Sequence, residues 1–504
     1  MECKKKGVKS APKGYNILLI TTDTQRTDTL SCMGSPFAHS PCLDRLAAEG
    51  VLFERAYTAA PACMPARCSI LTGLHAPLHG CVENGVKRYD GLPVFMDALK
   101  ELGYRNMMFG KTHFGPIPAS FDIAETINGE KGQSRQDFYS RYFAESGYPE
   151  ASGFPNSTPE AHCLDSLIVD RTIHHIREAE KTKTPFFAFC SLPSPHSPLD
   201  PPPEWEDCYR TQDIPAPHCT KEEWKTLPPS LQELCNLGKK GKTGDWIADL
   251  VEGEGNVAEN TDIESVKRYK ALYYADAAYC DALVGRLLAF LDESGLRKST
   301  LVIFTSDHGQ QYFDHGFNDK HNFYEETCRI PLIFSLPGVL PQKKRCSFAS
   351  TVDLAPSIVG AAGGCYREAN GFDLFTPLVH NENMPRTCAV SYIQHSMALI
   401  TERFSLEYYL DDRCLRLFDR QNDPVQDKNL AQEPRWKQLS HELLEALLLW
   451  YLELTDIKEL QARLSSGGPV AARAVRRLRK VEGNDGDRNL GDAVNRIMVE
   501  SAIR

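Results

Sequence analysis

Residues 16–23 of the chain are Asn-Ile-Leu-Leu-Ile-Thr-Thr-Asp, a short apolar block that ends in polar residues. Such a block is typical of a strand that is buried on both faces of a sheet. Further blocks of this kind occur at residues 185–192, 301–305 and 330–334. The sequence therefore predicts several strands in the interior of one sheet.

Helical patterns lie between these predicted strands. Apolar residues recur at helical spacing within residues 41–50 and 266–294, and a further helix is expected at residues 163–180. Strands that alternate with helices favour an α/β fold, in which helices cover both sides of a mostly parallel sheet. Ligands in such folds bind beyond the carboxyl ends of the strands. Residues that can do chemistry follow three of the predicted strands, namely Asp23, His196 and the pair Asp307-His308.

The remaining segments differ from these in composition and in the pattern of apolar residues. Residues 200–262 are rich in proline, glycine and charge, and we expect an inserted loop region that shapes the mouth of a pocket. Short alternating runs predict a small antiparallel sheet, at residues 389–392, 404–409 and 415–418. A Leu-rich helix at residues 436–454 follows, and then a tail with a basic helical stretch and a Gly/Asp/Asn loop. We therefore expect an α/β domain at residues 14–384 and a C-terminal subdomain at residues 385–504.

The overall composition excludes several classes of function. With 504 residues, 42% apolar and 25% charged, and a formal net charge of -10, the chain is an ordinary globular protein and not a nucleic-acid binder. Basic runs at residues 4–13 and 473–480 are interpreted as solvated termini. No apolar run reaches the length of a secretory signal or a membrane span, which predicts a cytoplasmic protein without a membrane partner. The 17 cysteines include no C-x-x-C pair, which favours free thiols in a reducing compartment.

Residues 63–73 are Cys-Met-Pro-Ala-Arg-Cys-Ser-Ile-Leu-Thr-Gly. This segment resembles the signature of the sulfatase family, C-x-P-x-R followed by small residues and Leu-Thr-Gly. The resemblance implies that a formylglycine-generating or radical-type maturation enzyme oxidises Cys63 to formylglycine. One hydroxyl of the hydrated aldehyde then attacks sulfur and the second expels sulfate, so that one difficult displacement becomes two easier steps. The alternative is that Cys63 is one more buried thiol.

Two further segments match the family in order along the chain. Residues 23–28 resemble its metal-binding entry, which makes Asp23 a metal ligand, with Thr24 where the family usually has Asp, Asn or Gln. Residues 110–115 match G-K-x-H-x-G, in which Lys111 contacts the formylglycine and the sulfate, and His113 takes the proton that drives sulfate release. A phosphate-binding loop ending at Gly110-Lys111-Thr112 is excluded, because Arg105 stands where that loop needs glycine.

The remaining matches lie after the later predicted strands. The resemblance makes His196 the acid that protonates the departing alcohol, and Arg67 and Lys320 contacts to the diol and to the sulfate oxygens. Asp307 and His308 are then metal ligands together with Asp23, Thr24 and the modified Cys63. His315 is a candidate pocket residue, and His321 a structural or outer contact. The oxygen ligands favour one Ca²⁺ ion, with Mn²⁺ or Zn²⁺ as alternatives because His308 supplies an imidazole.

The resemblance covers roughly residues 15–430 and implies the alkaline-phosphatase-like α/β fold with a small C-terminal antiparallel sheet. It implies hydrolysis of a sulfate monoester on a sulfated small molecule or saccharide. Two alternatives remain open. Thr24 and His308 also fit a phosphodiester or phosphonate monoester hydrolase of the same superfamily. The other alternative is a noncatalytic protein that binds sugar sulfates, although each implied catalytic position carries a competent side chain.

Overall fold

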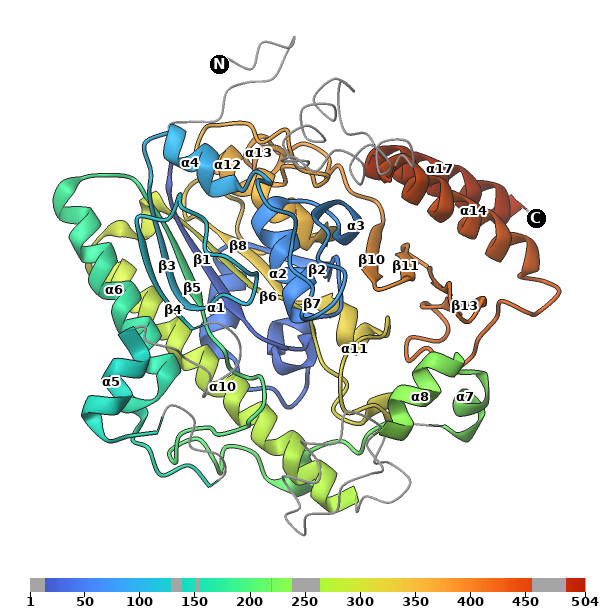
Figure 1. Ribbon diagram of the computed structural model, residues 1–504, viewed down its shortest axis with the longest axis horizontal. Coiled ribbons are helices and arrows are strands. Elements are labelled where there is room, and N and C mark those ends of the chain that lie inside the picture. The colour runs from blue at the N-terminus through green and yellow to red at the C-terminus, as the bar shows by residue number, and fades with distance from the viewer. Residues whose placement is uncertain are drawn as a thin grey trace.

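The computed structural model of the protein describes residues 14–127, 138–149, 155–218, 220–237, 263–455 and 486–503. A large sheet lies between two layers of helices, and a second, smaller sheet lies to one side of it (Figure 1). The predicted basic runs near the two ends fall outside the described residues, as do residues 238–262 of the predicted insertion. The predicted α/β class with an additional antiparallel sheet is confirmed.

The main sheet has nine strands, and most of its pairs are parallel. Its strands are β1 (Asn16–Thr22), β2 (Val51–Tyr57), β3 (Arg105–Lys111), β4 (Ile123–Ile127), β5 (Phe186–Ser191), β6 (Thr300–Ser306), β7 (Arg329–Ile330), β8 (Leu332–Ser335) and β9 (Lys344–Ser350). The order is β4-β3-β5-β1-β6-β8-β2-β7, and β9 pairs with β2. The five strands from β4 to β6 run parallel, whereas β8 is antiparallel to both β6 and β2.

The single strand predicted at residues 330–334 is wrong in one respect, because the structure divides it in two. Pro331 separates β7 from β8. Proline has no N–H to donate to a sheet ladder, so a strand interrupted by proline loses pairing at that point. As a result β7 pairs only with β2, whereas β8 pairs with both β2 and β6.

Helices cover both faces of the main sheet, as predicted. One face packs against α1 (Pro41–Ala48), α6 (Leu164–Thr182) and α10 (Ile263–Glu293), and the other against α2 (Cys63–Thr72), α4 (Phe95–Glu101) and α12 (Leu354–Ala361). Because side chains alternate along a strand, Leu18 and Ile20 of β1 enter the first core and Ile17 and Leu19 the second. All four side chains are fully buried. The apolar run that opens the chain is thus the centre of the protein.

The second sheet is an antiparallel meander next to the main sheet. Its strands are β10 (Ala389–Ile393), β11 (Ser396–Ile400), β12 (Phe404–Tyr409) and β13 (Cys414–Asp419). The Leu-rich helix is confirmed as α14 (Lys437–Leu454), and α17 (Gly486–Ile503) packs beside it (Figure 1). The loop predicted for the tail is wrong from Gly486 onward, because the apolar residues Leu490 and Val494 bury one side of α17. The shorter helices are α3 (Ala76–His79), α5 (Phe138–Ser146), α7 (Lys221–Thr226), α8 (Pro229–Leu237), α11 (Glu325–Cys328) and α13 (Phe375–His380).

Two expectations from composition can be compared with the described residues. All cysteines whose redox state can be read from the described residues are free thiols. Most of these thiols are buried. None of the described helices is both long enough and apolar enough to cross a bilayer.

Candidate active site

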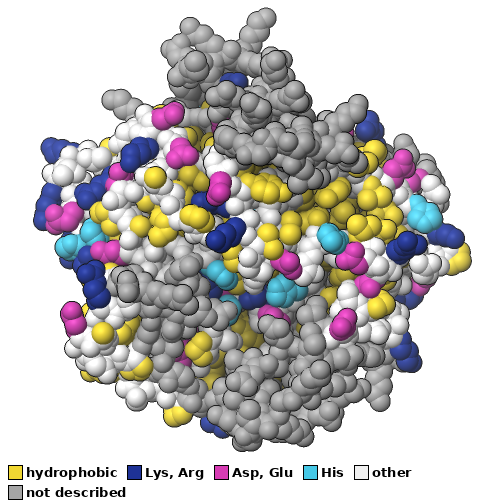
Figure 2. Space-filling view, viewed as in Figure 1, with side chains coloured by type: hydrophobic (Ala, Val, Ile, Leu, Met, Phe, Trp, Pro, Cys, Tyr) yellow, Lys and Arg dark blue, Asp and Glu magenta, His cyan; other side chains and the backbone are white. Residues whose placement is uncertain are grey.

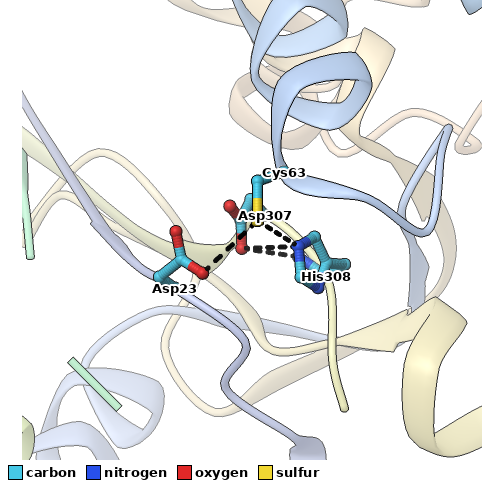
Figure 3. Close-up of side chains that lie close together, drawn as sticks. All are labelled: Asp23, Cys63, Asp307 and His308. Carbon is cyan, nitrogen blue, oxygen red and sulfur yellow. Dashed lines mark hydrogen bonds and ion pairs between the residues drawn. The ribbon is translucent and has the colours of Figure 1, made fainter. Parts of the chain in front are cut away.

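The carboxyl ends of the parallel strands bring the predicted site residues together. Asp23 directly follows β1, Asp307 directly follows β6, and Lys111 is the last residue of β3. All three side chains are fully buried. Figure 3 shows the side chains of Asp23 and Asp307 directed toward one another, together with Cys63 and His308. This edge is where an open α/β sheet binds its ligands.

Cys63 is the first residue of α2 and points into this group. Its Sγ lies 3.2 Å from His308 Nε2 and 3.8 Å from Asp23 Oδ1. The side chain is 1% exposed. The first backbone N–H groups of a helix give its start a partial positive charge, and Asn84 accepts one of them from Met64 at 3.0 Å. The fold therefore places the Cys63 side chain where negative charge is stabilised.

Nearby cations act on the same side chain. Burial raises the pKa of the Cys63 thiol, but Lys320, His308 and Lys111 lower it more, so that it lies well below its usual range. A hydrogen bond from His113 acts in the same direction. The pocket is thus arranged to stabilise an anion at this position, whatever atom carries the charge.

Arg67 fixes the two carboxylates. It lies one helical turn after Cys63, so both side chains project from the same face of α2. Its Nε donates to Asp307 Oδ2 and its Nη2 to Asp23 Oδ2, both at 2.8 Å. Its Nη1 donates to Ser191 Oγ at 2.8 Å. Sequence analysis missed Ser191, although its place at the end of β5, beside β1 and β3, is a signal that could have found it.

The two carboxylates are not electrostatically equivalent. Burial and Cys63 raise the pKa of Asp23, but Lys111 and Arg67 lower it more, and Lys111 Nζ lies 2.8 Å from Asp23 Oδ2. Burial and the neighbouring Asp23 raise the pKa of Asp307 more than His308 and Arg67 lower it. The pKa of Asp307 therefore lies above its usual value, whereas that of Asp23 lies below. Two carboxylates held this close in a buried site favour binding of a cation.

Thr24 holds a strained position beside them. Its φ is 62°, which is unusual for a β-branched residue, and its backbone N–H donates to Asp307 Oδ1 at 3.2 Å. Its Oγ1 is buried and has no hydrogen-bond partner among the described residues. An unpaired buried hydroxyl is costly, so this oxygen fits a role as a metal ligand. His113, His315 and His321 also have positive φ.

His196 and Lys320 lie next to each other at this site. His196 Nε2 is 3.2 Å from Lys320 Nζ, and His196 Nδ1 donates to the Ser197 carbonyl at 2.7 Å. Lys320 is 6% exposed, whereas His196 is half-buried.

The Nδ1 atom of His113 is buried and makes no hydrogen bond within the described part of the chain. In Figure 2, histidine side chains gather near the middle of the face with basic side chains among them.

The two remaining candidate histidines contact other residues. His315 is buried, with Nδ1 2.7 Å from Glu223 Oε1 and Nε2 3.4 Å from Glu326 Oε2. His321 Nδ1 lies 3.7 Å from Asp319 Oδ2. Candidate ligand atoms of Asp23, Cys63, Asp307 and His308 all lie within 4.8 Å of one another, and His315 is not among them. The arrangement can therefore hold a divalent ion next to Cys63, with His315 in a separate cluster.

Comparisons of the sequence with known proteins identify the family of this chain. The sequence profile of the sulfatase family matches residues 15–364, and the profile described as N-sulphoglucosamine sulphohydrolase, C-terminal, matches residues 313–451. An arylsulfatase of Clostridium perfringens is 28% identical over 89% of this chain and 95% of its own length. An N-acetylglucosamine-6-O-sulfatase of Bacteroides thetaiotaomicron is 25% identical over 87% of this chain and 86% of its own.

A solved structure supports the fold. The phosphonate monoester hydrolase of Agrobacterium radiobacter aligns with a TM-score of 0.75 at 23% identity, over 86% of this chain and 95% of its own. The sulfatase profile covers most of the chain and ends close to the C-terminal end of α12. The chain therefore belongs to the sulfatase family and is a sulfuric ester hydrolase with an alkaline-phosphatase-like fold.

Proposed function

We propose that Cys63 is converted to formylglycine and that the mature enzyme hydrolyses a sulfate monoester beside one divalent metal ion. The observation that carries this proposal is the position of Cys63 Sγ, at the start of α2 and 3.2 Å from His308 Nε2. In the unmodified chain this sulfur stands in for the hydroxyl oxygens of the hydrated aldehyde. When present, the hydrated aldehyde supplies one hydroxyl to attack sulfur and a second to release sulfate.

Asp23, Asp307 and His308 would hold the metal ion, with Thr24 Oγ1 as a further oxygen ligand. The buried, unpaired Thr24 hydroxyl and the convergence of the two carboxylates support this set. When bound, the ion would neutralise charge on the sulfate oxygens. Three oxygen donors favour Ca²⁺, whereas the imidazole would also suit Mn²⁺ or Zn²⁺.

The other residues of the site have separate tasks. Lys111 and Lys320 would contact the sulfate oxygens, and Arg67 would hold the diol while it fixes the two carboxylates. His196, as the imidazolium, would give its Nε2 proton to the departing alcohol oxygen, while Nδ1 keeps its hydrogen bond to the Ser197 carbonyl and so fixes the ring. His113 would accept the proton from the second hydroxyl, and its hydrogen bond with the Cys63 side chain supports this role.

The substrate we propose is a sulfated saccharide or another small sulfate ester. The relatives named above are an arylsulfatase and an N-acetylglucosamine-6-O-sulfatase, so aryl and sugar sulfates are the two classes to examine first. A sulfated sugar has a basic leaving oxygen, which agrees with a histidine acid placed beside the reacting group.

A phosphodiester or phosphonate monoester hydrolase is the second candidate, favoured by one observation. Many sulfatases have Asn at the position of His308, whereas His at this position also occurs in related phosphonate and phosphodiester hydrolases, and here His308 Nε2 approaches Cys63 Sγ. Parallel kcat/KM measurements of matured enzyme on sulfated saccharides, aryl sulfates, phosphodiesters and phosphonate monoesters test the two candidates. We expect sulfate esters to react fastest, and faster turnover of phosphodiesters or phosphonates would overturn the proposed function.

A further inference from the structure

A second group of possible metal ligands lies outside the Cys63 site. Glu223 belongs to α7, His315 to the loop between β6 and α11, and Asp427 to the loop after β13. One ligand atom from each of these residues lies within 4.8 Å of the other two. Glu223 and His315 are each 1% exposed. Three segments far apart in the sequence thus bring one imidazole and two carboxylates to a single point.

The contacts of His315 resemble those of a metal-binding histidine. Its Nδ1 faces Glu223 Oε1 at 2.7 Å, and its Nε2 faces Glu326 Oε2 at 3.4 Å. Histidines that bind a metal through one ring nitrogen usually donate the other N–H to a carboxylate, which fixes the ring. Glu326 is in a position to do this while Nδ1 is directed to the point where Glu223 and Asp427 meet.

Glu223 supplies an oxygen that the surrounding protein does not satisfy. Its Oε1 accepts a hydrogen bond from the Tyr324 hydroxyl. Its Oε2 is buried and has no hydrogen-bond partner among the described residues. A buried carboxylate oxygen without a partner is costly, because it has lost its contact with water and gained no hydrogen bond in return. A cation bound by this carboxylate would remove that cost.

Asp427 and His218 form the solvent side of the group. His218 Nε2 lies 2.6 Å from Asp427 Oδ1, and the two side chains are 42% and 30% exposed. The rings of His218 and His315 are 5.8 Å apart at an angle of 75°. An ion could therefore enter from solvent past His218, and that second imidazole lies close enough to orient Asp427 or to complete the ligand set.

We propose that Glu223, His315 and Asp427 bind a second divalent ion of the zinc class, with His218 beside it. Mixed imidazole and carboxylate donors suit Zn²⁺. The ion would be structural, because it joins α7 and the C-terminal sheet to the loop that leads to Lys320. A protonated His315 between Glu223 and Glu326 would account for the same contacts without an ion, and this is the outcome that the experiment must separate.

The test is zinc binding by the full chain after removal of metals with a chelator, in the presence of excess Ca²⁺ to occupy the Cys63 site. The variants are Asp427→Asn and Glu223→Gln. The matched control is Asp411→Asn, because Asp411 also pairs with a histidine, His395 at 3.2 Å, but both side chains are largely exposed. No third carboxylate, imidazole or thiol from the described part of the chain converges on that pair. Bound zinc is counted by elemental analysis, and zinc-dependent melting temperature is recorded in parallel.

We expect wild type and Asp411→Asn each to bind one more zinc ion per chain than Asp427→Asn does. The affinity of the second site for zinc should fall at least tenfold in Asp427→Asn. Zinc should raise the melting temperature of the first two proteins only. X-ray absorption at the zinc edge should detect imidazole and carboxylate ligands at about 2.0–2.2 Å.

Equal zinc binding by Asp427→Asn and Asp411→Asn, or no zinc bound by wild type in excess Ca²⁺, would overturn the proposal. Should Glu223→Gln fail to fold, Asp427→Asn decides alone, since Asp427 is partly exposed. Sulfatase turnover does not enter the test, so its outcome is independent of the proposed function.

Discussion

Replacement of His196 by alanine tests the proposed acid. The change removes an imidazole whose Nε2 lies 3.2 Å from Lys320 Nζ and whose Nδ1 donates to Ser197. General acid catalysis contributes about 10²–10⁴-fold, which corresponds to about 2.7–5.4 kcal/mol of transition-state stabilisation. The structural cost is smaller, because a half-buried residue loses these two hydrogen bonds, each worth about 0.5–1.5 kcal/mol of stability. The variant should therefore fold and turn over slowly.

The size of the loss should depend on the leaving group. A sugar or alkyl alkoxide is strongly basic and needs a proton to depart, whereas a nitrophenolate departs almost unaided. We expect His196→Ala to lower kcat/KM for an alkyl or sugar sulfate by the full factor, and for nitrophenyl sulfate by much less. This holds provided that bond cleavage limits both rates.

His321→Ala is the matched control, because His321 contacts Asp319 and no role in proton transfer is proposed for it. Its losses should be the same on both substrates. Equal losses for His196→Ala on both substrates, together with a lowered melting temperature, would refute the reasoning and identify His196 as a structural residue.

Three other predictions follow from the site and its surroundings. Asp307→Ala should remove the metal ion of the Cys63 site and nearly all turnover, and elemental analysis in the presence of Ca²⁺ checks it. Arg67→Lys should lower kcat/KM by at least about 10²-fold with wild-type folding, because an ammonium cannot reach both carboxylates in the way that a guanidinium does. Burial raises the pKa of Glu125, but two 2.7 Å hydrogen bonds from Arg171 lower it more. A lowered folded-state pKa gives stability above the unfolded pKa of about 4.3 that is lost as the pH falls through the folded value. Glu125→Gln should thus cost about 1 kcal/mol at neutral pH in denaturant titrations and almost nothing below the folded pKa.

The fold could be predicted where the sequence pattern is local. The apolar blocks that became β1, β5 and β6 are buried on both faces, and no tertiary information is needed to recognise them. The strands β2 and β9 were not predicted, because charged residues interrupt their apolar pattern. Glu54 of β2 and Arg345 of β9 form an ion pair across the two neighbouring strands at the surface. When β2 and β9 pair, these two charged side chains lie next to each other at the surface and neutralise one another. The local sequence does not specify this pairing, so it does not show that the two segments are strands.

The candidate site was predictable to a similar extent. Asp23 and Asp307 could be placed together because the ends of parallel strands meet at one edge of a sheet. The convergence of Cys63 on the same point was implied only by the family resemblance, because α2 reaches the sheet edge from a separate segment. Ser191 and Glu223 were missed, since a single serine or glutamate has no signal until its partner is known. For Glu223 that partner, His315, is 92 residues away.

The chemical state of residue 63 in active enzyme is the measurement that tests the central claim most directly. Protein produced with a maturation enzyme would be digested, and the peptide containing residue 63 analysed by mass spectrometry alongside the turnover of the same sample. We predict that the thiol sulfur of Cys63 is replaced by an aldehyde oxygen, and that turnover rises in proportion to the converted fraction. Full activity in a sample whose Cys63 retains an intact thiol would contradict the account.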